Sequence, residues 1–327
     1  MTRVGLVLGG GGAVGQAHHA GVLAALEHDL GWDPRTADVI VGTSVGSITG
    51  TLLRHGVPAS DLAAWSVRAP LSTPSTVVAD LFGEDRPRFV PFRARDLVRR
   101  LPSLPGRHMA QHALLQPWHF RPITAAFASL APGRHDITEQ VTALAGLEGR
   151  PWPDEQFWVP AVRRRDGRRV VFGRPGTSQV PLHQAVAASC AVPGYFAPVI
   201  VADRRFVDGG IHSPTNADVL LNEHLDVVII VSPMSGPSGL PRDPYGVTRW
   251  HAGRLVNREV KRLRAQGSTV VVFEPDQHQQ RLMGNDLMAS ERVADISTAS
   301  FFAAGASAAT PQIRNALAGL TSPTRPR

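Results

Sequence analysis

Several residue types and patterns are scarce in this chain of 327 residues, and each scarcity excludes a class of protein. The single cysteine, Cys190, rules out an intramolecular disulfide framework and favours a reducing compartment. No apolar run approaches the ~18 residues that a membrane-spanning helix needs. Four glycines interrupt the apolar run at 4–8 before a secretory signal can form. We therefore expect a cytoplasmic protein with at most peripheral membrane contact.

Lysine is also nearly absent. Lys261 is the only lysine, and arginine supplies the rest of the positive charge. The 34 basic residues exceed the 27 acidic ones by seven, giving a net charge of +7. This excess is too small and too scattered for the concentrated basic stripe of a nucleic-acid-binding protein. Seven arginines nevertheless lie between Arg86 and Arg107, around a short amphipathic pattern at 94–101. Such a segment would suit an anionic lipid surface.

The composition, 43% hydrophobic and 19% charged, is typical of a globular protein. Two units of apolar strand, glycine turn and amphipathic helix open the chain, with strands at 4–8 and 38–41. This order predicts a parallel sheet with crossover helices. Later patterns predict further strands at 158–163, 169–172, 206–207, 227–232 and 269–273, and helices at 184–189, 247–266 and 298–320. Asp166-Gly167 between the first two of these strands predicts a β-hairpin.

A glycine-rich loop follows the first predicted strand and reads Gly9-Gly10-Gly11-Gly12-Ala13-Val14-Gly15. It satisfies the G-x-G-x-x-G pattern of dinucleotide-binding proteins at Gly10, Gly12 and Gly15. Such a protein also needs an acidic residue at the end of its second strand, where this chain has Gly42-Thr43-Ser44. The free N–H groups of the loop can hold a phosphate, or equally the oxyanion of an acyl-transfer intermediate.

Two further glycine-marked motifs follow predicted strands. The first, Gly42-Thr43-Ser44-Val45-Gly46, matches the G-x-S-x-G turn in which glycines make room for an exposed nucleophilic serine. The second, Asp208-Gly209-Gly210, places a carboxylate at a strand end where a general base can be approached closely. All three motifs stand at carboxyl ends of strands, so we expect them to meet at one edge of the sheet. Together they favour serine acyl chemistry.

The sequence resembles the patatin-like phospholipase family over about residues 4–218. The likeness rests on the three motifs above, in the family's order, and on the tract Ala188–Val199. It implies a three-layer α/β/α fold with a mainly parallel central sheet. The likeness is weak at 70–155, where prolines recur and the spacing of Asp136 and Glu139 predicts the start of a helix, and we interpret this region as an inserted helical cap. Strands and helices at 219–320 would complete the same domain, and 321–327 would form a tail.

The resemblance also implies a Ser–Asp dyad without cofactor or metal. In this scheme Ser44 attacks an ester carbonyl of a lipid and Asp208 takes its proton, while backbone N–H groups of Gly10, Gly11 and Gly12 bind the oxyanion. The remaining motif glycines would shape the turns. They are Gly15, Gly42, Gly46, Gly209 and Gly210.

One departure and three alternatives accompany this interpretation. Family members usually carry arginine or lysine where this chain has Val14. An interaction protein that keeps a decayed hydrolase fold is therefore one alternative, and a dinucleotide-binding protein is another. A Ser–His–Asp triad is the third, since His212 follows Asp208 by four residues.

Overall fold

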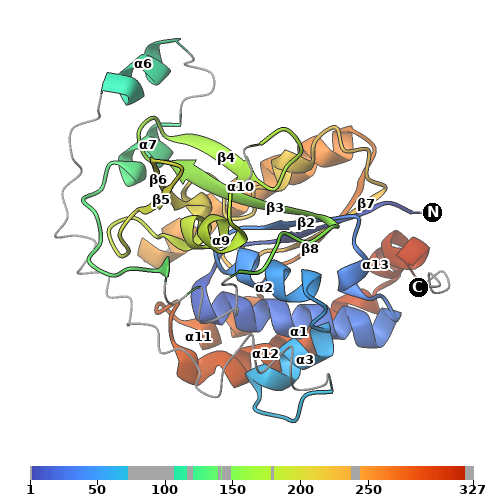
Figure 1. Cartoon of the computed structure of the whole chain (residues 1–327). Coiled ribbons are helices and arrows are strands. Elements are labelled where there is room, and N and C mark those ends of the chain that lie inside the picture. Colours follow the sequence, from blue (N-terminus) through green and yellow to red (C-terminus); the bar gives the residue numbers. More distant parts are fainter. Residues whose placement is uncertain are drawn as a thin grey trace.

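A computed structural model describes residues 2–72, 107–115, 121–138, 141, 149–177, 180–236 and 244–320, and it shows an α/β fold around one mixed sheet (Figure 1). The strands are β1 (Val4–Leu8), β2 (Val39–Gly42), β3 (Gln156–Arg163), β4 (Arg168–Phe172), β5 (Val199–Val201), β6 (Arg204–Asp208), β7 (Val227–Val231) and β8 (Thr269–Phe273). They follow the order β5-β6-β3-β2-β1-β7-β8, with β4 also paired to β3. The pairs among β3, β2, β1, β7 and β8 are parallel, so the predicted mainly parallel sheet is confirmed.

Helices cover both faces of this sheet. The α-helices are α1 (Gly12–Leu30), α2 (Val45–Arg54), α3 (Ala59–Ser66), α6 (Arg107–Leu115), α7 (Pro122–Ala128), α9 (Leu182–Cys190), α10 (Pro244–Ala265), α11 (Gln277–Met283), α12 (Val293–Ala308) and α13 (Pro311–Leu317). The predicted single helix at 298–320 is wrong, because Pro311 begins a new helix, with Thr310 as its N-cap residue. No helix among the described residues is both long and apolar enough to cross a bilayer.

The alternation of side chains along β1 explains the two covered faces. Leu6 and Leu8 join a core cluster with residues of α1 and α2, such as Leu23 and Leu52. Val7 points to the opposite face and packs with residues of α10. Successive side chains of a strand point to opposite faces, so a strand that is apolar throughout requires helices on both sides. In Figure 1 α1, α2 and α12 lie on one side of the sheet and α10 on the other.

The strand β3 extends beyond its neighbour β2 and carries an antiparallel extension of the sheet. Its first residues pair with β2 in parallel, while Val159–Arg163 pair antiparallel with β4. The strand β6 runs back along the same part of β3, with Asp208 opposite Ala161. The strand that ends in Asp208 is therefore antiparallel to β3, unlike β1 and β2, which belong to the parallel part of the sheet. Asp208 reaches the site because β6 runs in the opposite direction from the far end of β3.

The expected cap at 70–155 is described only in part. Its helices α6 and α7 pack together through Met109 and Ala125, beside Val162 of β3 and Val207 of β6. The arginine-rich segment at 86–107, except for Arg107 at the start of α6, lies outside the described residues, and so does most of the helix expected from Asp136.

Candidate active site

Ser44 lies at the tight turn between β2 and α2. Its backbone has φ 53° and ψ −127°, a strained conformation for a residue with a side chain. The Ser44 amide donates to Ser189 Oγ at 2.9 Å, and this hydroxyl donates to the Pro160 carbonyl at 2.7 Å. A side chain from α9 therefore ties the strained turn to β3. Ser189 belongs to the tract Ala188–Val199 that carries the family resemblance, but its role could not be predicted because its partners come from distant segments.

The motif glycines lie where backbones meet. A Cβ atom at Gly46 would stand 2.0 Å from the Leu8 carbonyl oxygen, and one at Gly209 would stand 2.3 Å from the Pro160 carbonyl oxygen. No side chain fits at such distances, so the turns of Ser44 and Asp208 both need glycine to reach the neighbouring strands. Gly15 and Gly42 also pack closely, Gly15 against Val45 and Gly42 against the backbone of α2.

The glycine loop presents backbone N–H groups at the start of α1. The Gly10 amide donates to the Pro214 carbonyl at 2.9 Å and is not free to bind a ligand, so the expectation that includes Gly10 among the oxyanion donors is corrected. Across the part of the chain that the structure describes, the amides of Gly11 and Gly12 donate no hydrogen bond. A helix N-terminus with free amides favours a negatively charged group.

Asp208 is buried at the end of β6, with 4% of its surface exposed. Its Oδ1 accepts a hydrogen bond from the Gly210 amide at 2.6 Å. Burial raises the pKa of Asp208 to about 6, and the Gly210 amide and the Ser44 side chain partly offset this rise. The carboxyl group is therefore a stronger base than an ordinary aspartate and interacts with the Ser44 hydroxyl.

A cavity of about 300 Å³ opens in front of these residues. Ser44, Asp208 and the loop glycines at 10–12 lie at its wall. The rest of its lining is almost entirely apolar and includes Ile48, Ile123, Phe127, Ile137, Val192, Phe196, Met234, Leu255, Leu287 and Met288. His251 of α10 also lines the cavity, and no sequence pattern marked it. Such a cavity suits an apolar chain attached to a polar reacting group.

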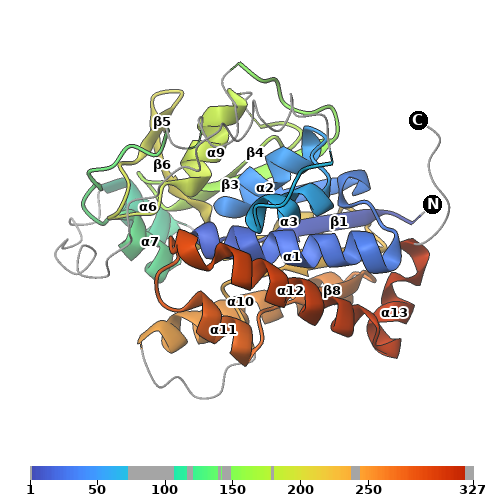
Figure 2. The same cartoon turned by 90° about the horizontal axis from the view of Figure 1, so that it is seen from below.

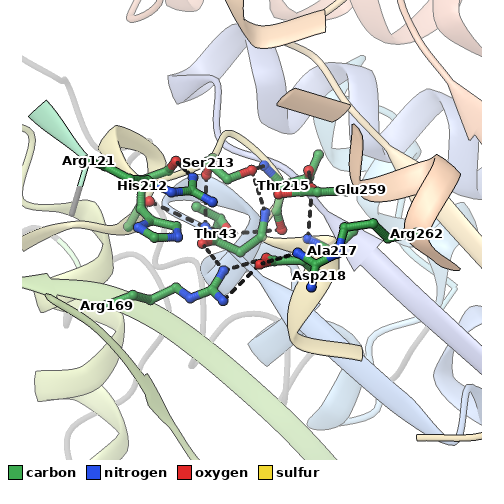
Figure 3. Close-up of polar contacts among 12 residues, drawn as sticks. Thr43, Arg121, Arg169, His212, Ser213, Thr215, Ala217, Asp218, Glu259 and Arg262 are labelled. Atoms are coloured by element: carbon green, nitrogen blue, oxygen red, sulfur yellow. Dashed lines mark hydrogen bonds and ion pairs between the residues drawn. The ribbon is translucent and has the colours of Figure 1, made fainter. Parts of the chain in front are cut away.

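His212, which the sequence offers for a triad, and the two histidines that follow the glycine loop, His18 and His19, do not line the cavity. The His212 imidazole is surrounded by Arg121, Arg169 and Asp218 (Figure 3), and burial together with the two guanidinium groups lowers its pKa to about 3. His18 and His19 are buried in α1, where burial lowers their pKa values to about 4 and about 3. They contact hydroxyl groups of neighbouring helices. The groups that act on the pKa of Asp208 are Ser44 and Gly210, and no histidine is among them.

Val14 and Cys190 have packing roles in this structure. Val14 is 1% exposed and packs with Met283, Val293 and Ile296 of the C-terminal helices. Its position is apolar and closed, which explains why it holds no cation. Cys190 is buried, and burial raises the pKa of its thiol, so the thiol stays protonated.

These features can be compared with known proteins. A model of the patatin-like phospholipase family matches residues 6–221, which cover most of the sheet, the glycine loop and the turns of Ser44 and Asp208. The chain belongs to the patatin-like phospholipase family. The predicted family is thus confirmed.

Relatives of this patatin-like protein include uncharacterized NTE family proteins of Mycobacterium bovis and Mycobacterium tuberculosis. Each is 28% identical over 250 residues, which are 76% of this chain and 54% of the relative. The chain thus spans about half the length of the curated relatives that it matches. Among solved structures, the match to VipD from Legionella pneumophila covers 94% of this chain and 67% of the VipD chain, with a TM-score of 0.43 and 13% sequence identity. The match to the type III effector protein ExoU covers 99% of this chain and 54% of the ExoU chain, with a TM-score of 0.39 and 19% sequence identity.

Proposed function

We propose that this protein is a serine acyl hydrolase that cleaves carboxylic esters of lipids, of the phospholipase or lysophospholipase type, without a cofactor. One observation carries the proposal. Ser44, the buried carboxyl of Asp208 and the free amides of Gly11 and Gly12 all lie at the wall of a single apolar cavity. These are the nucleophile, base and oxyanion donors that acyl transfer requires.

In the proposed reaction, Ser44 Oγ attacks the ester carbonyl carbon while Asp208 accepts the serine proton. The carbonyl oxygen becomes an oxyanion, which accepts hydrogen bonds from the Gly11 and Gly12 amides. The alcohol then leaves with the proton from Asp208, and the acyl group remains on Ser44. A water molecule attacks this acyl-enzyme, again with Asp208 as the base, and releases the fatty acid.

The cavity supports an acyl chain as the group that is transferred. Its apolar lining comes from early elements, such as Ile48 of α2, and from late ones, such as Leu255 of α10 and Leu287. Because both parts of the chain build the same cavity, we take residues 4–218 and 219–320 as one catalytic domain with the cap inserted at 70–155.

We further propose that the protein reaches its substrate at a lipid surface. Ile123 and Phe127 of α7 line the cavity and are at the same time 53% and 40% exposed. Apolar side chains that are both exposed and continuous with the cavity suit contact with lipid. The arginines expected to favour anionic lipid, including Arg99 and Arg100, lie outside the described residues. Their role stays a prediction, which would fail if Arg99→Glu/Arg100→Glu bound anionic vesicles as well as the wild type.

Labelling of the purified protein with a fluorophosphonate tests the proposed function directly. We expect the wild type to become labelled and to hydrolyse a short-chain p-nitrophenyl ester, whereas Ser44→Ala does neither. Ser60→Ala removes an exposed hydroxyl on α3 and serves as the matched control, with unchanged labelling. A wild type without Ser44-dependent labelling or turnover would contradict the hydrolase function and favour an interaction protein with this fold.

A further inference from the structure

A buried asparagine lies between the turn that carries Ser44 and the turn that carries Asp208. Asn216 is 0% exposed, and its backbone has φ 53°, a conformation that asparagine and glycine tolerate better than other residues. It precedes the short 3₁₀-helix η3 (Ala217–Leu220) that leads from the Asp208-Gly209-Gly210 turn toward β7. Asn216 is not among the residues that line the cavity, so its side chain acts on other parts of the protein.

The Asn216 side chain joins the two turns by hydrogen bonds. Its Nδ2 donates to the Ser213 carbonyl at 2.8 Å. The same nitrogen lies 3.2 Å from Thr43 Oγ1, next to the nucleophile, and 3.3 Å from the Gly209 carbonyl, next to the base. An amide nitrogen has two hydrogens, so the second is shared between Thr43 and Gly209. Thr43 Oγ1 is free to accept because its own hydrogen goes to the Thr215 carbonyl.

The orientation of this amide is fixed by a guanidinium group. Arg169 Nη1 donates to Asn216 Oδ1 at 3.0 Å. Arginine has only donors, so Oδ1 must face Arg169 and Nδ2 must face the two turns. The alternative orientation would place the amide hydrogens against the guanidinium and leave the Gly209 carbonyl without this donor.

The guanidinium is in turn held from the opposite side. Arg169 of β4 binds both carboxylate oxygens of Asp218 in η3 (Figure 3). Burial alone would raise the pKa of Asp218, but the hydrogen bonds and charge of Arg169 lower it, so the pair stays ionised. Glu259 of α10 accepts hydrogen bonds from the Thr215 hydroxyl and the Ala217 amide on either side of Asn216. The segment around Asn216 is therefore clamped by β4 and α10.

We propose that Asn216 is a positioning residue that sets the placement of Ser44 relative to Asp208 by bonding Thr43 and Gly209 at once. The inference rests on the proposed function, because it concerns the geometry of that dyad. Ser44 and Asp208 come from strands that do not pair with each other, and the Ser189 hydroxyl links the Ser44 turn to β3 rather than to the Asp208 turn. Asn216 supplies a direct connection between these turns, and its removal leaves both dyad residues present but their spacing free to change.

Asn216→Gly is the test variant, because glycine accepts φ 53° and only the side chain is lost. We expect kcat for a soluble p-nitrophenyl ester to fall about 10- to 100-fold, since small misplacements of reacting groups cost this much. KM should stay within about threefold, because the cavity lining is intact. Asn222→Gly is the matched control: Asn222 has φ 70° but is bonded to the exposed Gln266 away from the site, and it should keep the wild-type kcat.

The pH profile separates positioning from a general loss of folded protein. The Ser44 side chain lowers the pKa of Asp208, so a displaced Ser44 should shift the midpoint of the kcat/KM profile to higher pH in Asn216→Gly. A smaller folded fraction would reduce the amplitude of the profile and leave its midpoint in place. That result, with Tm and circular dichroism showing partial unfolding, would overturn the proposal.

Variants of Thr43 test the connection itself. Thr43→Val removes the hydroxyl that accepts from Asn216 and should lower kcat, whereas Thr43→Ser keeps the hydroxyl and should restore most of it. Asn216→Gly should cost much less in the Thr43→Val background than in the wild type, because the bond is already broken. Independent losses, or an Asn216→Gly enzyme with wild-type kcat, would overturn the inference and leave the proposed function intact. A wild type without Ser44-dependent turnover would overturn both.

Discussion

At the scale of single residues, the burial of Asp208 determines the pH at which the proposed dyad works. The carboxyl can accept the Ser44 proton only when it is ionised, and burial raises its pKa to about 6. We therefore expect kcat/KM to increase as the pH rises through about 6 and to level off near pH 7. A rate profile for a soluble ester from pH 4.5 to 8.5 measures this midpoint. A midpoint near 4, the ordinary value of aspartate, would contradict the burial argument.

The same burial predicts a stability cost at the site. In the unfolded chain Asp208 ionises near pH 4, whereas in the folded protein it ionises near pH 6. The folded state is thus penalised increasingly from pH 4 to 6, and the full penalty of about 2–3 kcal/mol applies above pH 6. Asp208→Asn should abolish turnover and yet raise the free energy of unfolding at pH 8, with the gain vanishing near pH 4. Urea unfolding of both proteins at the two pH values measures this difference, and a free energy of unfolding of Asp208→Asn below that of the wild type at pH 8 would contradict the prediction.

Some of these residues could be predicted from the sequence and others could not. Ser44 and Asp208 stand in short motifs at predicted strand ends, so local pattern was enough to select them as candidates. Asn216 carries no local pattern, and Ser189 stands in the tract Ala188–Val199 without an assigned role. The importance of both residues comes from partners in distant segments, such as Thr43 and Pro160. The inclusion of Gly10 was wrong for the same reason, since the carbonyl of Pro214 that occupies its amide lies far along the chain.

At the scale of elements, strand and helix periodicity predicted most of the fold but not the direction of β6. Its apolar residues are compatible with either direction, and only pairing with the extended part of β3 makes it antiparallel. The Asp166-Gly167 turn did predict the antiparallel β3–β4 hairpin, which is confirmed. Turn chemistry is encoded locally, whereas the place of a strand in a sheet depends on the rest of the chain.

The contact between α1 and α12 gives a prediction at the same scale. The two helices lie side by side (Figure 2), and a Cβ atom at Gly21 of α1 would stand 2.2 Å from the Ser297 carbonyl oxygen. The obstacle is backbone, so Gly21→Ala must push the helices apart and should cost about 1–3 kcal/mol or more. Urea denaturation measures this loss.

Gly305→Ala in α12 is the matched control for this helix pair. The atom nearest to its added Cβ would be the end of the exposed Asp29 side chain, which can move away. Alanine is also the better helix former, so this variant should be neutral or gain about 0.5–1 kcal/mol. Equal destabilisation by both substitutions would show that the backbone contact at Gly21 is not what limits packing between the helices.

At the scale of the whole molecule, the proposed approach of a lipid to Ser44 involves the exposed apolar side chains of α6 and α7. The helix α6 packs on α7 through Met109, projects beyond it in Figure 1, and exposes Leu114 and Leu115 by 79% and 74%. Ile123 and Phe127 of α7 are also exposed, and these two side chains line the cavity. In the proposed contact with a lipid surface, these exposed apolar side chains of α6 and α7 would enter the lipid.

This arrangement predicts that substitutions on α6 affect membrane-bound substrates selectively. Leu114→Asp/Leu115→Asp should lower turnover of a lipid ester in vesicles about tenfold or more, because two apolar side chains no longer enter the lipid. Turnover of a soluble p-nitrophenyl ester should not change, since neither residue lines the cavity. Phe302→Asp, on α12 and 69% exposed, is the matched control and should leave both rates unchanged. Equal loss on soluble and vesicle substrates would place the effect of α6 in folding or catalysis rather than in contact with lipid.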